Sequence, residues 1–365
     1  CMRSIKVNLE KKYSCSYEIR IGSGIADRIA LLIDKNQKAG RYIIITDDNV
    51  ARLHGKNFLA LLKNIGLAAC LIDFPAGEAS KNISTILDIS DKLLKLGADR
   101  TTCLIALGGG VVGDMTGFIA SVYMRGVPYV QIPTSLVAQV DSAIGGKTAI
   151  DLPAGKNLLG TFYQPAGVFA DLNFLNTLPA KEFENGMAEI IKYGIIDDEK
   201  MFRLLEENMD AVKQKDPAIL LKIVENCCRI KKAIVEIDER EQGLRRILNY
   251  GHTLGHALEA VSDYKLSHGE GVALGMIAAA RISAKKNYLD AGQAKRIEEL
   301  IGLANLPVKI PASLQTEEII KRLQMDKKKK GDTIHFVLLK KTGMPFINGG
   351  VETEIIDEVI EEMKL

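Results

Sequence analysis

The chain has 365 residues, enough for about two domains with substantial cores. Forty-eight lysines and arginines face 46 aspartates and glutamates, so the formal net charge is only +2. This balance, with 5% aromatic residues and no tryptophan, argues against the charged or base-stacking surfaces that bind nucleic acid. No apolar run approaches the roughly 18 residues that a membrane-spanning helix needs.

The cysteines and the first residues bear on the cellular compartment. The six cysteines show no CxxC spacing and no disulfide framework. The opening residues, CMRSIKVNLEKKYS, lack the apolar core of a signal peptide. We therefore expect a cytoplasmic protein that binds neither nucleic acid nor membranes.

The first half of the chain alternates short apolar runs with helical segments. Helices are predicted at 50–65 and in the segment that ends near residue 96. Strands that alternate with helices predict a mostly parallel sheet with both faces covered, an α/β fold. The predicted strands are residues 17–21, 42–46, 71–74, 102–107, 129–132 and 168–170.

The pattern changes to successive helices between residues 179 and 304, including 182–195 and 218–237. A strand at 334–339 and an amphipathic helix at 353–364 follow. We therefore expect an α/β domain over residues 1–172 and an all-α domain over residues 173–365. Ligand sites favour domain interfaces, so the active site is expected in the cleft between them.

A glycine-rich loop, Gly108–Gly110, follows one predicted strand and precedes a helix. Glycine lets a ligand approach the backbone, and a helix N-terminus favours phosphate. This is not the standard dinucleotide fingerprint, because the candidate ribose-binding acids, Asp47 and Asp48, come before the glycines. A structural turn is the alternative, but Glu78 and Lys81 after another strand favour a nucleotide that lies across several strand ends.

Three of the five histidines lie within seventeen positions. His252 and His256 are four apart and share a helix face, and His268 opens the next helical run. Two histidines and a carboxylate would give a zinc-like ion three ligands and one open position. Thr253 occupies the place of the glutamate in HExxH proteases, so the spacing suggests a metal site without naming its chemistry. Surface or core histidines are the alternative.

Residues 133–160 are rich in glycine, and their polar side chains are predicted to lie in loops. Lys192 follows Glu189 by three residues and shares its helix face. Together the cations would suit a substrate with a carboxylate or phosphate, although each one alone is more often a solvated surface charge. The loop residues are Asp141, Lys147, Lys156 and Asn157, and the further donors are Arg125, Lys231, Arg245 and Asn249.

These segments together closely resemble the 3-dehydroquinate synthase family, which are phosphorus–oxygen lyases of the shikimate pathway. The resemblance covers about residues 15–340, and the motifs occur in the family's order. They are PAGEASK, ALGGGVVGDMTGFIASVYMRG, PTSLVAQVDSAIGGKTAID, GKNLLG, GMAEIIKYG, DEREQGLRRILNYGHTLGHALE, HGEGVALGM and MDKKKKG.

The resemblance implies a Rossmann-like NAD-binding domain joined to a helical domain that binds metal and substrate. It implies NAD+, one divalent ion (zinc or cobalt) and a homodimer. The implied substrate is 3-deoxy-D-arabino-heptulosonate 7-phosphate. Its conversion to 3-dehydroquinate and phosphate proceeds by transient oxidation, phosphate elimination, re-reduction, ring opening and aldol closure.

The resemblance also implies residue roles. The implied metal ligands are Glu189, His252 and His268. The implied substrate-site residues are Arg125 (donated across the dimer), Asp141, Lys147, Asn157, Lys192, Lys231, Arg245, Asn249 and His256. The implied cofactor-site residues are Asp47, Asn49, Glu78, Lys81, Gly109, Gly110, Asp114, Thr134, Ser135, Lys147, Lys156, Phe174, Thr177, Leu178 and Glu182. The family's DKK motif falls on residues 326–328, without an assigned role.

Three alternatives to this function remain. One is a metal-dependent alcohol dehydrogenase of the glycerol dehydrogenase kind, which would accumulate NADH. Another is a related sugar-phosphate cyclase of the 2-deoxy-scyllo-inosose or valiolone type, whose substrate lacks the carboxylate. The last is a regulator that binds nucleotide or metal without catalysis.

Overall fold

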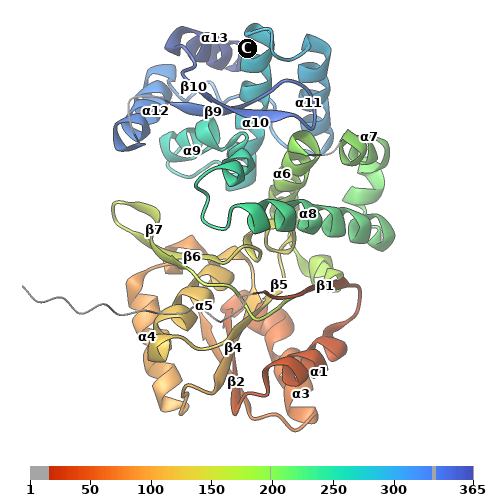
Figure 1. Ribbon diagram of the computed structural model, residues 1–365, viewed down its shortest axis with the longest axis vertical. Helices are drawn as coiled ribbons and strands as arrows, with labels where there is room; N and C mark the ends of the chain where they lie inside the picture. The colour runs from red at the N-terminus through yellow and green to blue at the C-terminus, as the bar shows by residue number, and fades with distance from the viewer. Residues whose placement is uncertain (1–15, 198, 331–333, 365) are drawn as a thin grey trace, which may run out of the picture.

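The computed structural model describes residues 16–197, 199–330 and 334–364, without the side chains of residues 36 and 326–330. The DKK motif therefore lies outside the described side chains. A six-stranded parallel sheet, in the order β1-β8-β5-β4-β2-β3, forms the lower half of the molecule in Figure 1. All six predicted strands are present, each within two residues of its predicted ends. They are β1 (Ile19–Gly22), β2 (Arg41–Asp47), β3 (Ala69–Phe74), β4 (Thr102–Gly108), β5 (Tyr129–Pro133) and β8 (Val168–Asp171).

Helices cover both faces of this sheet. On β4 successive side chains point to opposite faces. Leu104 and Ala106 pack with α4 and α5, whereas Cys103 and Ile105 pack with α1 and α3. The sheet is therefore buried on both sides, as the uninterrupted apolar runs predict. The helices and turns here are α1 (Ala26–Gln37), α2 (Asp48–Val50), η1 (Ala51–Gly55), α3 (Lys56–Asn64), η2 (Glu78–Ser80), α4 (Ile83–Lys95), α5 (Gly110–Val122), η3 (Tyr123–Arg125), η4 (Ala138–Ser142) and η5 (Leu172–Thr177).

An antiparallel hairpin of β6 (Lys147–Leu152) and β7 (Gly155–Phe162) projects from the α/β part toward the helices. The prediction of loops is wrong here: Lys147, Lys156 and Asn157 lie on these strands, and the π-helical turn η4 carries Asp141. Most residues of β7 are exposed on both faces. The segment therefore lacks the polar–apolar alternation by which a half-buried strand is recognised.

The described residues of the second part of the chain are helical except for one hairpin. The predicted strand at 334–339 is present as β9, and its partner β10 was not anticipated. The predicted division between residues 172 and 173 falls after β8 and before α6, and it stays a prediction. The elements are α6 (Ala180–Ile196), α7 (Glu199–Lys213), α8 (Pro217–Ile237), η6 (Leu244–Asn249), α9 (His252–Val261), α10 (His268–Lys285), α11 (Ala291–Leu303), α12 (Thr316–Lys330), β9 (His335–Leu339), β10 (Pro345–Gly349) and α13 (Thr353–Lys364).

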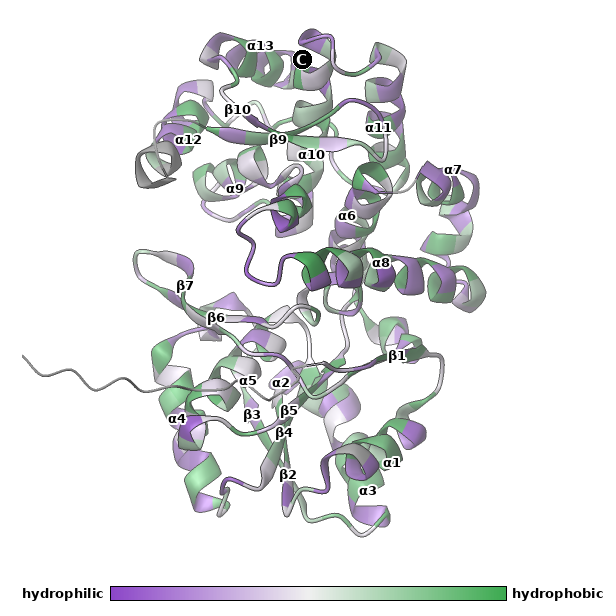
Figure 2. Cartoon of the chain, viewed as in Figure 1, coloured by the Kyte–Doolittle hydropathy of each residue, from purple (hydrophilic) through white to green (hydrophobic). Residues whose placement is uncertain are grey.

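Helix α8 illustrates how polar residues come to be buried in this part. Hydrophobic and hydrophilic residues alternate in bands along it, as expected of a helix with one buried face (Figure 2). Leu220, Ile223, Val224 and Cys227 lie on that face, and so does Lys231. Within the described residues, no helix combines the length and apolar composition that a bilayer crossing requires.

Glycines allow α9 and α10 to cross with their backbones in contact. A Cβ added at Gly275 would lie 1.8 Å from the carbonyl oxygen of Gly251, and one at Gly255 would lie 2.9 Å from the backbone of Gly271. Such distances are below van der Waals contact, so no larger residue fits without a shift of the helices. The close crossing brings the first residues of α9 and α10, His252 and His268, next to each other.

Candidate metal centre and its charged surroundings

Three side chains from three helices converge on one point. They are Glu189 of α6, His252 of α9 and His268 of α10, here called the ligand group. The Nε2 atoms of both histidines lie 3.4 Å from Glu189 Oε1. One ligand atom from each residue can be chosen so that all lie within 4.8 Å of one another. Two imidazoles and one carboxylate form a known donor set for a catalytic zinc ion, with one position left open.

The environment of Glu189 fits a divalent cation. Its side chain is fully buried, and its carboxylate oxygens contact Lys192 and the two imidazoles without a hydrogen bond of normal geometry from any described residue. Burial raises the pKa of Glu189, but Lys192 and His252 outweigh it and hold the pKa well below its usual value. A buried, ionised carboxylate with unfilled acceptor sites is what a metal ion satisfies.

Both histidines of the ligand group have a partner at the ring nitrogen that faces away from Glu189. His252 Nδ1 lies 3.1 Å from the carbonyl oxygen of Tyr250, and His268 Nδ1 lies 3.1 Å from Glu259 Oε1. Burial lowers the pKa of His268, but the nearby carboxylates of Glu189 and Glu259 outweigh it and raise the pKa to about 10. The ring of His256 lies edge-on to that of His252, at 5.3 Å between centres, and 5.9 Å from that of His268, but His256 does not join Glu189.

A row of four charges with alternating sign, the charge row, extends from the ligand group to the α/β part: Glu189, Lys192, Asp141 and Lys231. Lys192 pairs with Glu189 and lies 3.9 Å from Asp141 Oδ2. Asp141 pairs with Lys231 of α8 and accepts a hydrogen bond of 2.9 Å from the Tyr193 hydroxyl. The row therefore joins η4 to α6 and α8.

The pKa values of the residues in the charge row are shifted in different directions. Burial raises the pKa of Asp141, but Lys231 and Lys192 outweigh it and lower the pKa. Burial lowers the pKa of Lys192, but Glu189 and Asp141 outweigh it and raise the pKa. For Lys231, burial together with the nearby cations outweighs Asp141, and the pKa is lowered. Lys231 is therefore the cation of the row that loses its proton most readily.

A second polar group lies where the hairpin β6–β7 meets η6. Glu241 pairs with Lys147 of β6 and accepts a hydrogen bond of 2.7 Å from Asn249. Arg245 is 1% exposed and donates to the carbonyl oxygens of Gly145, at 3.3 Å, and of Glu239. Its Nε has no hydrogen-bond partner among the described residues.

A third group lies beside the glycine loop. Lys81 is buried and donates to Asp114 Oδ2 at 2.6 Å and to Asn157 Oδ1 at 2.5 Å. Burial lowers the pKa of Lys81, but Asp114 and Glu78 outweigh it and raise the pKa. Gly110 is the first residue of α5, so the free N–H groups of that helix face this region.

The other predicted cofactor residues are distributed around the carboxyl ends of the strands. Asp47 ends β2 and caps α2 by accepting from Val50 N at 2.9 Å. Lys156 lies 4.0 Å from Glu78 Oε1, and its ammonium lies 4.3 Å from the centre of the Tyr264 ring. Gly109 is the N-cap residue of α5, and Leu178 is half-buried. Phe174 and Thr177 both contact His54. The remaining residues form hydrogen bonds close by: Asn49 with Arg52, Thr134 N with Gly108 O, Ser135 with Ala138 N, and Glu182 with Asn185.

Arg125 is not brought to these groups. It is exposed at the end of η3, and none of the contacts that join the described site residues involves it. Met124 and Arg125 have φ values of 50° and 69°, which are uncommon for residues other than glycine. Backbone held in this region is more common at functional sites than elsewhere, so the strain is an independent signal for Arg125.

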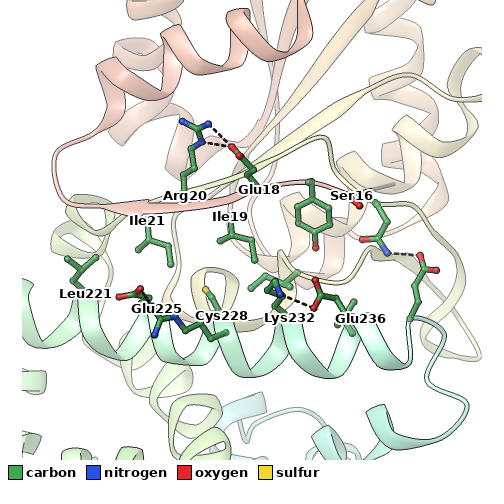
Figure 3. Close-up of a pocket in the computed structure, with 16 residues that line it drawn as sticks. Ser16, Glu18, Ile19, Arg20, Ile21, Leu221, Glu225, Cys228, Lys232 and Glu236 are labelled. Carbon is green, nitrogen blue, oxygen red and sulfur yellow. Dashed lines mark hydrogen bonds and ion pairs between the residues drawn. The ribbon is translucent and has the colours of Figure 1, made fainter. Parts of the chain in front are cut away.

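A cavity of about 1000 Å³ lies between β1 and α8 (Figure 3), and it adjoins the group around Arg245 because Glu239 lines it. Several of its charged residues already pair with one another. Glu18 pairs with Arg20, and Glu236 pairs with Lys232, as the dashed lines show. The cavity shares no residue with the ligand group, so its size alone assigns it no role.

Three contacting residues were not anticipated from the sequence. Glu241 bridges Lys147 and Asn249, Glu259 contacts His268, and Tyr193 donates to Asp141. Glu259 could have been noticed, because it follows His256 by three positions and His252 by seven and shares their helix face. Glu241 lies in an irregular segment, where no periodicity marks a partner.

Comparison with known proteins gives the family. The 3-dehydroquinate synthase N-terminal model matches residues 71–185, and the C-terminal model matches residues 186–329. The 3-dehydroquinate synthase of Pseudoalteromonas translucida is 44% identical over 99% of this chain and 100% of its own.

Solved structures agree with this match. A 2-epi-5-epi-valiolone synthase from Streptomyces hygroscopicus with NAD+ and Zn²⁺ bound is 26% identical, with a TM-score of 0.89 over 98% of this chain and 99% of its own. A 2-deoxy-scyllo-inosose synthase complexed with carbaglucose-6-phosphate, NAD+ and Co²⁺ is 28% identical, with a TM-score of 0.86 over 94% and 96%. The match along nearly the whole sequence places this chain in the 3-dehydroquinate synthase family.

Proposed function

We propose that the chain converts 3-deoxy-D-arabino-heptulosonate 7-phosphate to 3-dehydroquinate and phosphate, as a phosphorus–oxygen lyase of the shikimate pathway. The observation that carries the proposal is the ligand group at one end of a buried charge row, in a chain whose close relatives are 3-dehydroquinate synthases. Cations packed beside a metal site suit a substrate that bears both a carboxylate and a phosphate.

We propose that Glu189, His252 and His268 hold a zinc or cobalt ion and that NAD+ lies across the carboxyl ends of β2, β3 and β4. The solved relatives carry NAD+ with Zn²⁺ or Co²⁺. When bound, the ion polarises a substrate hydroxyl as a Lewis acid, and NAD+ supplies a reversible oxidation. The proposed cofactor residues are Asp47, Asn49, Glu78, Lys81, Gly109, Gly110, Asp114, Thr134, Ser135, Lys147, Lys156, Phe174, Thr177, Leu178 and Glu182.

The chain's own residues bind and orient the substrate. The proposed set is Asp141, Lys147, Asn157, Lys192, Lys231, Arg245, Asn249 and His256. Arg245 offers a buried guanidinium whose Nε is unfilled, which suits a bidentate anion. Burial lowers the pKa of Lys231 from the usual value of a lysine, which makes this ammonium a better proton donor than an exposed lysine and a candidate for proton transfer.

We also propose a cytoplasmic homodimer in which Arg125 reaches the partner's site. Two observations support this. Arg125 has a strained backbone and lies apart from the groups of its own chain. Val122, Met124, Leu158 and Phe162 are large hydrophobic residues with exposed side chains, and a hydrogen bond of 2.9 Å from the Thr161 hydroxyl to the Ser121 hydroxyl brings the segments of Val122 and Phe162 together. Exposed apolar residues that gather on one face often mark a protein–protein contact.

The test is release of phosphate from the heptulosonate phosphate by purified protein, with NADH absorbance followed in parallel. We expect phosphate without net NADH, and loss of activity after treatment with a chelator, restored by Zn²⁺ or Co²⁺. Accumulating NADH would indicate an alcohol dehydrogenase instead. Equal turnover of a sugar phosphate that lacks the carboxylate would indicate a cyclase of the inosose or valiolone type.

A further inference from the structure

Glu259 is a buried carboxylate that the proposed reaction does not use. It is 5% exposed and lies two turns after His252 on α9. Among the described residues, its side-chain hydrogen-bond partner is His268 Nδ1, at 3.1 Å. The fold leaves space for it, because a Cβ at Gly271 would lie 2.9 Å from Glu259 Cγ. A carboxylate buried against one ring nitrogen requires an explanation.

The contact fixes which nitrogen of His268 faces the ligand group. An ionised carboxylate only accepts hydrogen bonds, so Nδ1 carries the proton. Nε2, which lies 3.4 Å from Glu189, is then the nitrogen that can give up its proton and present a lone pair to a cation. Glu259 and His268 also lie at the distance of an ion pair, 3.1 Å between Oε1 and Nδ1.

His252 shows the same arrangement with a different acceptor. Its Nδ1 faces the carbonyl oxygen of Tyr250 and its Nε2 faces Glu189. Both imidazole rings of the ligand group are therefore oriented by a partner at Nδ1, which is a backbone carbonyl for His252 and a carboxylate side chain for His268. His256, which does not join Glu189, forms no such contact within the described residues.

We propose that Glu259 is a positioning residue for the metal centre, which holds the ring of His268 and its Nδ1 proton so that Nε2 is presented to the ion. This inference rests on the proposed function. Hydrogen-bond partners behind a ligand histidine typically change metal affinity by about ten- to a hundredfold. A carboxylate also adds negative charge near the cation, so charge and orientation both contribute.

Two variants separate these contributions. Glu259→Gln keeps the size and an amide oxygen that can accept from Nδ1–H, but removes the charge. Glu259→Ala removes both. The control is Asp263→Asn, which neutralises an exposed carboxylate just after α9 whose backbone φ of 52° asparagine tolerates.

The measurement uses metal-free full-length protein with Zn²⁺ or Co²⁺ as the only ligand. The dissociation constant comes from competition with a chromophoric chelator, and the visible absorption of bound Co²⁺ reports the geometry. We expect weakening of about ten- to a hundredfold for Glu259→Ala, a smaller loss for Glu259→Gln, and an altered Co²⁺ spectrum. Asp263→Asn should bind as the unmodified protein does. If Glu259→Ala does not fold, the isosteric Glu259→Gln decides.

Two results would overturn the inference. One is an unchanged dissociation constant and Co²⁺ spectrum in both Glu259 variants. The other is a second bound ion per chain that disappears in Glu259→Ala, because His256, Glu259 and His268 also bring ligand atoms within 4.8 Å of one another. The variant His252→Ala distinguishes a failure of this inference about Glu259 from a failure of the proposed function, because it tests the ligand group directly. If His252→Ala kept its ion, the ligand group itself would be wrong.

Discussion

Glu189 has two roles that substitution can separate. It faces two imidazoles on one side and the ammonium of Lys192 on the other. Removing His252 takes away one of the three ligands and leaves the ion pair intact. Removing Glu189 takes away a ligand and also leaves Lys192 with Asp141 as its nearest opposite charge.

We therefore predict that Glu189→Ala and His252→Ala both lose bound metal and activity, but differ in stability. Without metal, Glu189→Ala should lose about 3–5 kcal/mol of unfolding free energy, because half of a buried pair is removed. His252→Ala should lose less. Metal analysis and urea unfolding measure both effects. His256→Ala is the matched control and should keep its ion; the opposite pattern would mean that the ligand group has been wrongly chosen.

His54 gives a pH effect that is separate from the metal centre. Its ring packs against Phe174 at 4.8 Å, and Nε2 lies 2.7 Å from the Thr177 hydroxyl. Burial lowers the pKa of His54, and Asp171 offsets only part of this effect. The folded state therefore binds this proton less readily than the unfolded chain, whose pKa is near 6.5.

The stability that neutral His54 contributes is complete above the unfolded pKa and is lost as the pH falls through about 6.5 and below. We predict a steeper loss of unfolding free energy between about pH 7.5 and 5.5 than in His54→Gln, which can keep a contact with Thr177. Urea unfolding at several pH values measures the two slopes. Identical slopes would show that His54 does not titrate differently in the folded protein.

For individual residues, the spacing of the histidines indicated a metal site but could not select its ligands. His252 and His256 share one face of α9, and spacing alone makes either a candidate. The choice depends on where α6 and α10 place Glu189 and His268, which is tertiary information. The family resemblance named the same three ligands, and the convergence of their side chains in the structure is an independent observation.

Among the elements, strands buried on both faces were predicted best. The run that forms β4 is buried from end to end, is apolar after Thr102 and sits between turn residues, so its limits are visible in the sequence. The hairpin β6–β7 was missed because most of β7 is exposed and its glycines resemble loop sequence. Such a strand forms because it pairs with its neighbouring strand, and the residue pattern of the segment alone does not reveal that pairing.

The α9–α10 crossing yields a prediction about packing. Gly275→Ala places a Cβ 1.8 Å from the Gly251 carbonyl oxygen, so the helices must separate. We expect destabilisation of about 3 kcal/mol, at the upper end for overpacking, and weaker metal binding, because His252 and His268 move apart. Urea unfolding and metal competition measure the two losses.

The control for that change is Gly302→Ala on α11. There the nearest atom to the added Cβ is 3.5 Å away, at ordinary contact distance, and the residue is helical. The unfolding free energy of this variant should rise by up to about 1 kcal/mol, because alanine loses less conformational entropy than glycine when a helix forms. Equal losses in both variants would show that the crossing has no special sensitivity.

For the whole molecule, polar contacts join the two parts of the chain beside the ligand group. Asp141 meets Lys231, Lys147 meets Glu241, and Lys156 lies over the Tyr264 ring. Each contact joins a residue before β8 to a residue after it. In the first two contacts the partners are 90 and 94 positions apart along the chain. The proposed site is thus assembled by long-range contacts, which explains why sequence periodicity alone could not outline it.

The proposed dimer predicts complementation between two inactive variants. If Arg125 acts in the partner's site, a mixed dimer of Arg125→Ala and His252→Ala contains one site with both defects and one with none. Random mixing should restore about a quarter of the unmodified activity. Refolding the two variants together and assaying phosphate release measures this. A mixture that stays inactive while sedimenting as a dimer would place Arg125 in its own chain's site.

The charge row also constrains how this protein can change. Neutralising Asp141 alone leaves Lys231 without its opposite charge, whereas replacing Asp141 and Lys231 together with apolar groups of similar volume removes a complete pair and is far less damaging. Natural variants should therefore exchange these positions in pairs. Engineering toward substrates that lack an acid group is best begun with libraries in which opposite charges vary together.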